Sequence, residues 1–129
     1  MCIRDSLKAI DIINKNLKPQ LIGSDNFKTI IDVISKNLLG AAVVIKDNKP
    51  IGIITDGDIR RVFTLESDYK NITAKDIMSN NPVIIDSETL VSSALSIMNE
   101  NKISQIVVTD NNNYSGLIHI HNILNEGLF

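Results

Sequence analysis

The chain has 129 residues, of which 43% are hydrophobic and 22% charged, and its formal net charge is −2. This composition is typical of a globular protein that can bury a core without disulfides or metal. A slightly acidic chain with 4% aromatic residues and no tryptophan gives no reason to expect nucleic-acid or membrane binding. A single cysteine and no recognisable secretory leader predict a cytoplasmic protein.

Residues 1–6, Met-Cys-Ile-Arg-Asp-Ser, match the translation of a transposase adapter used in sequencing. We therefore expect this segment to be an adapter-derived artefact of gene prediction, and a genuine start is the alternative. If it is an artefact, Cys2 carries no functional information, and a domain that precedes residue 7 in the natural protein is missing.

The two halves of the chain repeat each other. Gly52 and Gly116 are 64 residues apart, and at this offset apolar positions coincide without a gap: Val43-Val44 with Val107-Val108, Ile54 with Ile118, and Ile59 with Ile123. Further upstream the register moves by one, so that Asp11-Ile12-Ile13 lies against Asp76-Ile77-Met78. Such a period indicates one structural unit used twice. We place repeat 1 at 7–70 and repeat 2 at 71–129, with a linker over 69–73.

The first half predicts the order strand, helix, strand, strand, helix. A short strand at 21–22 precedes a helix ended by Gly40, with an apolar face made of Phe27, Ile30, Ile31, Ile34 and Leu38. The apolar run 41–45 predicts a buried strand, and a polar turn leads to a second strand over 51–55. A last helix begins near Asp56 and turns three residues inward, namely Ile59, Val62 and Phe63.

The second half predicts the same order. A strand at 83–85 precedes a helix whose apolar residues are Leu90, Val91, Ala94, Leu95 and Met98. Strands over 105–109 and 114–119 flank the polar turn 110–113, and a final helix follows. The expected fold class is therefore α+β, with β-α-β-β-α used twice.

The segment Gly52-Ile53-Ile54-Thr55-Asp56-Gly57-Asp58 resembles the G-x-x-[ST]-x-x-D signature of cystathionine-β-synthase-type (CBS) domains. Asp76-Ile77-Met78, followed by Pro82, resembles the opening of such a repeat. The resemblance covers nearly the whole chain from about Leu7. It implies two β-α-β-β-α CBS repeats related by a pseudo-twofold axis, a Bateman module, with adenosyl or other nucleotide ligands in clefts between the two sheets.

A narrower resemblance is to the C-terminal CBS pair of the KpsF/GutQ group of D-arabinose-5-phosphate isomerases. It rests on Thr-Asp-Gly-Asp-Ile-Arg-Arg at 55–61 and on the closing run 117–127. Their chemistry lies in an N-terminal sugar-isomerase (SIS) domain that serves Kdo and lipopolysaccharide synthesis. This chain contains no such domain, so we expect no catalytic residues and no activity of this chain alone. The CBS pair of a sugar nucleotidyltransferase fits repeat 1 but fits the chain end poorly.

Thr55 and Asp58 have two interpretations. A Thr followed three residues later by an acid is close to a capping box, which satisfies free N–H groups at a helix start. In the functional interpretation, the Asp58 carboxylate accepts hydrogen bonds from both hydroxyls of a ribose, and Thr55 lies beside them. We favour ligand contact, which is compatible with capping, and we count Asp56 of the same turn among the ligand-binding candidates.

Gly52 and Gly57 are further candidates, because glycine lets a backbone approach an anion at a helix N-terminus closely. A tight turn is the alternative, and it explains Gly52 better than Gly57. Arg60 and Arg61 point about 100° apart on a helix, so we expect only one of them to face the cleft and bind phosphate. For either arginine alone, a solvated position is the default.

Gly116, His119, His121 and Asn122 are the candidates of repeat 2, where Asn122 stands in place of the family's Asp. His119 lies opposite Thr55, and the two histidines share a face if the strand continues through both. Without an evident third ligand we expect no metal site, and nothing around His119 supports catalysis. Because Asn is a weaker acceptor than Asp, we expect repeat 1 to hold a ribose more strongly.

The resemblance implies a small anionic, nucleotide-type ligand and no required cofactor. CMP-Kdo, as an end product of the pathway, and AMP or ATP, as general CBS ligands, are the candidates. We also expect a homo-oligomer formed through the CBS pairs. The competing interpretation is a structural module that stabilises an oligomer and binds no ligand.

Overall fold

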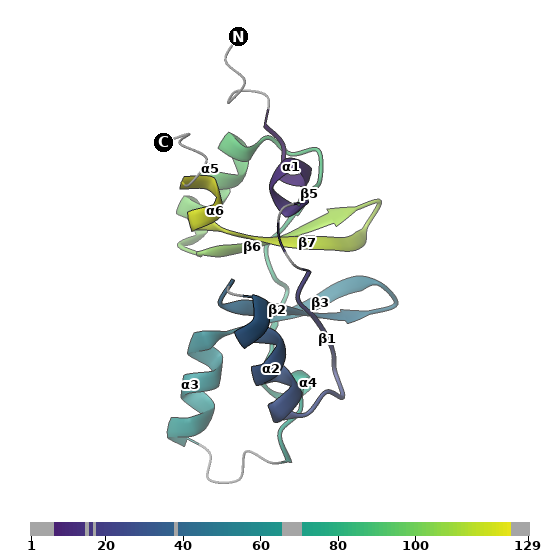
Figure 1. Cartoon of the computed structure of the whole chain (residues 1–129), viewed down its shortest axis with the longest axis vertical. Helices are drawn as coiled ribbons and strands as arrows, with labels where there is room; N and C mark the ends of the chain where they lie inside the picture. Colours follow the sequence, from purple (N-terminus) through teal and green to yellow (C-terminus); the bar gives the residue numbers. More distant parts are fainter. Residues whose placement is uncertain (1–6, 15, 17, 38, 66–70, 125–129) are drawn as a thin grey trace. The chain divides into compact units, whose positions relative to one another are not determined.

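The structure is a computed structural model that describes residues 7–14, 16, 18–37, 39–65 and 71–124. Two compact units make up the chain. The first unit is Pro19–Pro82, and the second consists of the described residues of Met1–Lys18 and Val83–Phe129. Each unit contains one β-α-β-β-α series and one additional short helix (Figure 1). The expected α+β fold with two such series is confirmed.

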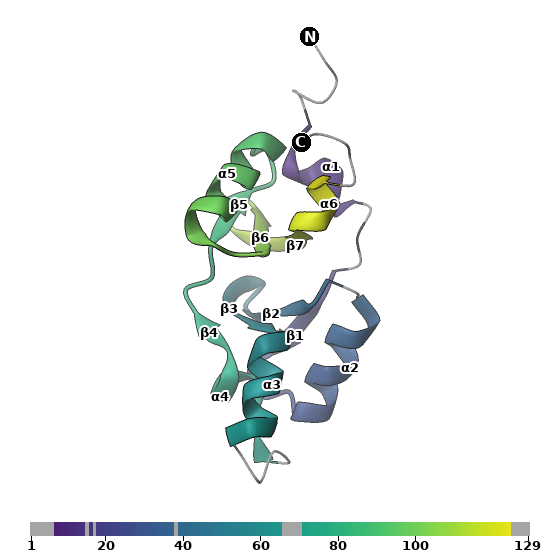
Figure 2. The same ribbon diagram turned by 90° about the vertical axis from the view of Figure 1, so that its left-hand side faces the viewer.

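The first unit is a four-stranded sheet covered on one face by helices, as Figures 1 and 2 both show. The strand order is β1-β2-β3-β4, with β1 parallel to β2 and the other pairs antiparallel. The core between sheet and helices centres on Ile30, Val44 and Ile54, all 0% exposed. In chain order the elements are β1 (Gln20–Ile22), α2 (Phe27–Asn37), β2 (Ala41–Lys46), β3 (Lys49–Thr55), α3 (Asp56–Leu65), α4 (Ala74–Ile77) and β4 (Ser79–Asn80).

The second unit is built on a three-stranded sheet of order β5-β6-β7. Strand β5 is parallel to β6, and β6 is antiparallel to β7. Its core contains Met98, Ile106 and Ile118, again 0% exposed. The elements are α1 (Ala9–Ile13), β5 (Ile84–Asp86), α5 (Val91–Asn101), β6 (Gln105–Asp110), β7 (Asn113–His119) and α6 (Ile120–Leu124).

The strand registers confirm the 64-residue repeat predicted from the sequence. Val44 pairs with Gly52 as Val108 pairs with Gly116, and the register shifts immediately after both valines. Each hairpin closes through two residues with positive φ, at angles of 54° and 65° in the first turn and 52° and 67° in the second. These angles are those of a two-residue turn that fits the strand twist, and Asp and Asn tolerate them well. The turn residues are Asp47-Asn48 and Asn111-Asn112.

The short helices α1 and α4 are exchanged between the sequence halves. Helix α1 lies at the start of repeat 1 but packs in the second unit, where Ala9 and Ile12 are 0% and 2% exposed. Helix α4 opens repeat 2 but packs in the first unit, where Ala74 is 0% exposed. Helices of five and four residues are stable only through such packing. The compact units therefore do not coincide with the sequence halves 7–70 and 71–129.

Two details of the predicted core are wrong. Phe63 was expected to face inward but is 55% exposed, and its ring meets that of Phe27 in a T-shaped contact with centroids 5.4 Å apart. Leu90 was expected within a helix, but it is the N-cap of α5 and is 40% exposed. The predicted positions of residues 1–6, Leu38, 69–70 and 125–129 fall outside the described residues. Within the described ranges, no helix is long and apolar enough to cross a membrane.

Candidate functional site

Thr55 and Asp58 form a hydrogen-bonded cluster at the start of α3. The Thr55 N–H donates to Oδ2 of Asp58 at 2.9 Å, and Oγ1 of Thr55 lies 3.2 Å from the same oxygen. The Asp58 N–H donates in return to Oγ1 of Thr55 at 3.4 Å. Nη2 of Arg61 forms an ion pair with Oδ1 of Asp58. These contacts are those of a capping box, to which Arg61 adds a charge-assisted hydrogen bond.

The Asp58 carboxylate has little acceptor capacity left. It is 6% exposed, and a carboxylate offers about four acceptor positions, of which Thr55 and Arg61 use three. A diol that approaches Asp58 therefore meets the Oδ1 edge, next to the Arg61 guanidinium. Because the Arg61 side chain is 66% exposed, it can move away from this edge without disturbing the core.

The other residues of α3 that the sequence predicted as ligand contacts are Asp56, Gly57 and Arg60. Asp56 and Arg60 are exposed, and the Asp56 N–H donates to the Gly40 carbonyl at 3.0 Å. A methyl group at Gly57 would meet no atom closer than 3.6 Å, so packing does not require glycine there. Gly57 is thus free of the structural constraint that a tight turn would impose.

Gly52 and Gly116 have packing partners instead. A Cβ at Gly52 would lie 2.5 Å from Sδ of Met78, and one at Gly116 would lie 2.8 Å from Cβ of Ile13. Met78, which follows α4, therefore packs directly on β3. Ile13, the last residue of α1, packs directly on β7. This close approach accounts for both glycines, and it supports neither the tight turn nor an anion contact at these two positions.

In the second unit, Asn122 occupies the place of Asp58. Its Oδ1 accepts hydrogen bonds from the His119 N–H at 2.8 Å and from Nδ2 of Asn16 at 3.1 Å. Nδ2 of Asn16 also donates to the Leu117 carbonyl at 3.2 Å. Sequence reasoning missed Asn16, because no local pattern links it to residues about a hundred positions away. This cluster carries no formal charge when His119 is neutral.

His119 and His121 are neighbours, but not on one strand as the sequence suggested, because β7 ends at His119 and α6 begins at Ile120. The His121 N–H donates to Nδ1 of His119 at 3.0 Å, and the ring centroids are 4.7 Å apart. Partial burial, and secondarily the charge of His121, lowers the pKa of His119 from its ordinary value. In the described part of the chain, no three His, Cys, Asp or Glu residues are grouped as metal ligands.

Acidification is expected to weaken the second unit through His119. The pKa of His119 is lower in the folded than in the unfolded chain. The contribution of the neutral ring to folding stability is therefore complete above about pH 6.5, and it is lost as the pH falls through the pKa of the folded chain. Protonation of Nδ1 also removes the acceptor for the His121 N–H. Urea unfolding at a series of pH values should show a smaller loss of stability for His119→Gln than for the parent. Parallel pH profiles of the two proteins would contradict this assignment.

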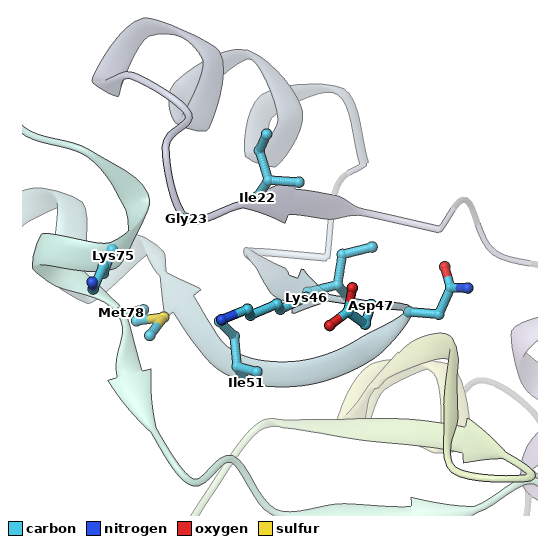
Figure 3. Close-up of a pocket in the computed structure, with 9 residues that line it drawn as sticks. Ile22, Gly23, Lys46, Asp47, Ile51, Lys75 and Met78 are labelled. Carbon is cyan, nitrogen blue, oxygen red and sulfur yellow. The ribbon is translucent and has the colours of Figure 1, made fainter.

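A groove that sequence reasoning did not predict lies beside the β2–β3 hairpin of the first unit. Its cavity volume is about 490 Å³. Figure 3 shows the residues that line it. Thr55 pairs with Ala41 at one end of these two strands, whereas Lys46 pairs with Lys49 at the other. The groove is therefore at the opposite end of the sheet from the capping box. We call it the hairpin groove; its side chains include Ile22, Ile45, Lys46, Ile51, Lys75 and Met78.

Comparisons with known proteins agree with this geometry. The CBS domain model matches residues 21–64 and 74–128. Arabinose 5-phosphate isomerase KdsD of Escherichia coli is 34% identical over 100 residues, which cover 77% of this chain and 30% of that protein. The chain thus spans about a third of the length of this curated relative.

Solved structures share the fold. A crystal structure of a CBS domain has a TM-score of 0.83 at 19% identity and covers 95% of this chain and 98% of its own. A CBS domain protein from Pyrobaculum aerophilum, complexed with AMP, has a TM-score of 0.80 at 21% identity and covers 93% and 97%. The model match covers most of the chain in two successive segments. The chain therefore belongs to the CBS domain family and contains a tandem pair of these domains.

Proposed function

We propose that this chain is a regulatory CBS pair that binds a nucleotide or sugar nucleotide and belongs to an arabinose-5-phosphate isomerase. The observation that carries this proposal is the 34% identity to KdsD over 77% of the chain. Because the match covers 30% of KdsD, the catalytic SIS domain would lie in the part that this chain lacks. The regulatory ligand would be AMP, ATP or CMP-Kdo, and the protein would act in the cytoplasm as a homo-oligomer.

Asp58 is the residue that we assign to the ligand's ribose. Its buried carboxylate lies at a helix start and keeps one acceptor position beside Arg61. Thr55 holds this carboxylate in place through two contacts to Oδ2. Gly57 leaves space beside this first turn, because a Cβ there would meet no atom closer than 3.6 Å. Arg60, which is exposed, and Arg61, once it releases Asp58, can bind phosphate.

The second unit would contribute the corresponding residues, His119, His121 and Asn122. Asn122 already accepts two hydrogen bonds, and its Oδ1 carries no formal charge. We therefore propose that the two repeats bind ligand unequally and that repeat 1 makes the stronger ribose contact. Gly52, Asp56 and Gly116 remain neighbouring positions without an assigned contact.

A structural role without ligand is the second candidate. It is favoured by the Asp58 contacts, since within the described ranges the carboxylate accepts hydrogen bonds from Thr55 and Arg61 alone, both near its own helix start. The 55% exposed Phe63 on α3 would suit a contact with a second copy. In this case Asp58 is only a helix cap.

Nucleotide binding distinguishes the two functions. A ligand that binds only the folded chain stabilises it by about 2.7 kcal/mol at 100 times its Kd, so thermal shifts with AMP, ATP, CMP and CMP-Kdo identify a binder. With that binder, Asp58→Asn is expected to weaken affinity roughly fivefold, because a neutral acceptor contributes about 1 kcal/mol less than a charged one. Titration calorimetry measures this change.

Asn122→Asp is the matched control, since it adds the carboxylate that Asp58→Asn removes. Its affinity is expected to equal or exceed that of the parent. The helix start should survive Asp58→Asn because Asn also caps helices. No thermal shift with any of the four compounds would favour the structural role. Unchanged affinity in Asp58→Asn would mean that Asp58 is a helix cap and that the ribose assignment is wrong.

A further inference from the structure

The hairpin groove combines apolar walls with two lysines. Ile22, Ile45, Ile51 and Met78 supply the apolar surface. Ile22 is 52% exposed at the end of β1, the edge strand of the sheet, in which only Leu21 is buried. At about 490 Å³, the cavity falls within the range of small-molecule sites.

The charge of the groove is positive. Among the described residues, neither Lys46 nor Lys75 has an ion-pair partner within 4 Å. Figure 3 shows Lys46 extending over Ile51 toward the part of the groove where Met78 and Lys75 lie. Asp47 lies in the hairpin turn, and it is the one acid among the described lining residues. The two cations therefore border the same apolar surface.

The second repeat provides an internal comparison. The β-α-β-β-α series is the same in both units, yet four of the positions that make this groove apolar or basic are polar or acidic in repeat 2. The 64-residue offset and the shared strand registers place Ile22 opposite Asp86, Ile45 opposite Thr109, Lys46 opposite Asp110, and Ile51 opposite Ser115. The fold thus does not need apolar or basic side chains at these four positions.

We propose that the hairpin groove is a second ligand site, specific for a small anion with an apolar body. The apolar body would cover Ile22, Ile51 and Met78, which removes their surface from water. Its carboxylate, sulfonate or phosphate group would lie between Lys46 and Lys75. The site is separate from Thr55 and Asp58, and it does not depend on the proposed nucleotide binding.

The probe for this site is anilinonaphthalene sulfonate, whose fluorescence increases in apolar surroundings. Added to the 129-residue chain, it is expected to bind saturably and to shift the backbone amide signals of Gly23, Ile45 and Ile51 in proton–nitrogen correlation spectra. N-phenylnaphthylamine, which has similar rings but no anionic group, should bind more weakly. Shifts confined to Thr55 and Gly57 would overturn the proposal while supporting a ligand at the helix start.

Charge reversal tests the two lysines. The double variant Lys46→Glu with Lys75→Glu is expected to weaken the binding of anilinonaphthalene sulfonate about three- to tenfold. The affinity for the neutral N-phenylnaphthylamine should stay nearly unchanged. The control is Lys28→Glu with Lys36→Glu on α2, which gives the same net charge at exposed positions outside the groove. Equal weakening by the two double variants would mean a general charge effect and would overturn the site.

Ile22→Asp tests the apolar wall without disturbing the core, because it introduces at an exposed position the residue that repeat 2 has there. It is expected to weaken both the sulfonate and the neutral amine severalfold. Unchanged binding of both compounds would overturn the proposal. So would concentration-dependent dimerisation that excludes the probe, because a second copy would then cover the groove.

Discussion

Ile12→Ala is expected to destabilise the second unit by about 2–4 kcal/mol while leaving the first unit intact. Ile12 lies at the start of repeat 1 in the sequence, but it is 2% exposed in the core of the second unit, which contains Met98 and Ile118. Removing its outer carbons leaves a cavity there. Urea unfolding measures the loss of stability, and amide hydrogen exchange locates it, with faster exchange expected in β6 and β7.

Ile77→Ala is the matched variant, because Ile77 ends α4 and is partly buried against the core of the first unit. Ile77→Ala should lower the free energy of unfolding by less, about 1–2 kcal/mol, and amide hydrogen exchange should become faster in β2 and β3. If Ile12→Ala accelerated amide hydrogen exchange in β2 and β3 instead, α1 would pack in the first unit with the rest of repeat 1. The swap of α1 and α4 between the sequence halves would then be wrong.

Gly116→Ala is expected to cost about 2 kcal/mol, although it adds a single methyl group. The new Cβ would lie 2.8 Å from Cβ and 2.9 Å from Cγ2 of Ile13, so α1 must move away from β7. At Gly52 the nearest atoms are Sδ and Cγ of Met78, at 2.5 Å and 2.8 Å. A methionine side chain can change rotamer, so Gly52→Ala should cost less, about 1 kcal/mol.

Gly57→Ala is the control for these two variants. The added methyl has room, and replacing glycine within a helix stabilises by roughly 0.5–1 kcal/mol. Thermal unfolding of the three variants should therefore rank Gly57→Ala above the parent, with Gly52→Ala below it and Gly116→Ala lowest. A Gly116→Ala protein as stable as the parent would show that Ile13 does not press on β7.

The regular part of the fold follows directly from the sequence. Val43-Val44 and Val107-Val108 coincide at the 64-residue offset, and in the structure both pairs have partners at equivalent positions and the same register shift. Polar turns with Asp and Asn marked both hairpins. Local chemistry determines such features, so the printed residues are sufficient to predict them.

The exchange of α1 and α4 could not be predicted in the same way. Both helices begin with an N–H to aspartate hydrogen bond of 2.9 Å, from Lys8 to Asp11 and from Thr73 to Asp76. Because the two openings are so alike, no local pattern tells which sheet each helix covers. The Asn16 to Asn122 contact and the hairpin groove were missed for the same reason, since both join residues far apart in the sequence.

The exchanged helices give the two units different folding requirements. The first unit is a continuous stretch, Pro19–Pro82, and its contacts are complete once that stretch has left the ribosome. The second unit joins residues near 9–13 to strands that begin at Ile84, so a whole folded unit is inserted within its chain. During synthesis, Ile12 and Ile13 of α1 therefore stay exposed to solvent until the ribosome has completed β7. A nonsense or frameshift mutation between Pro82 and Gly116 therefore leaves one finished unit that carries an unpartnered apolar helix, a species prone to aggregation.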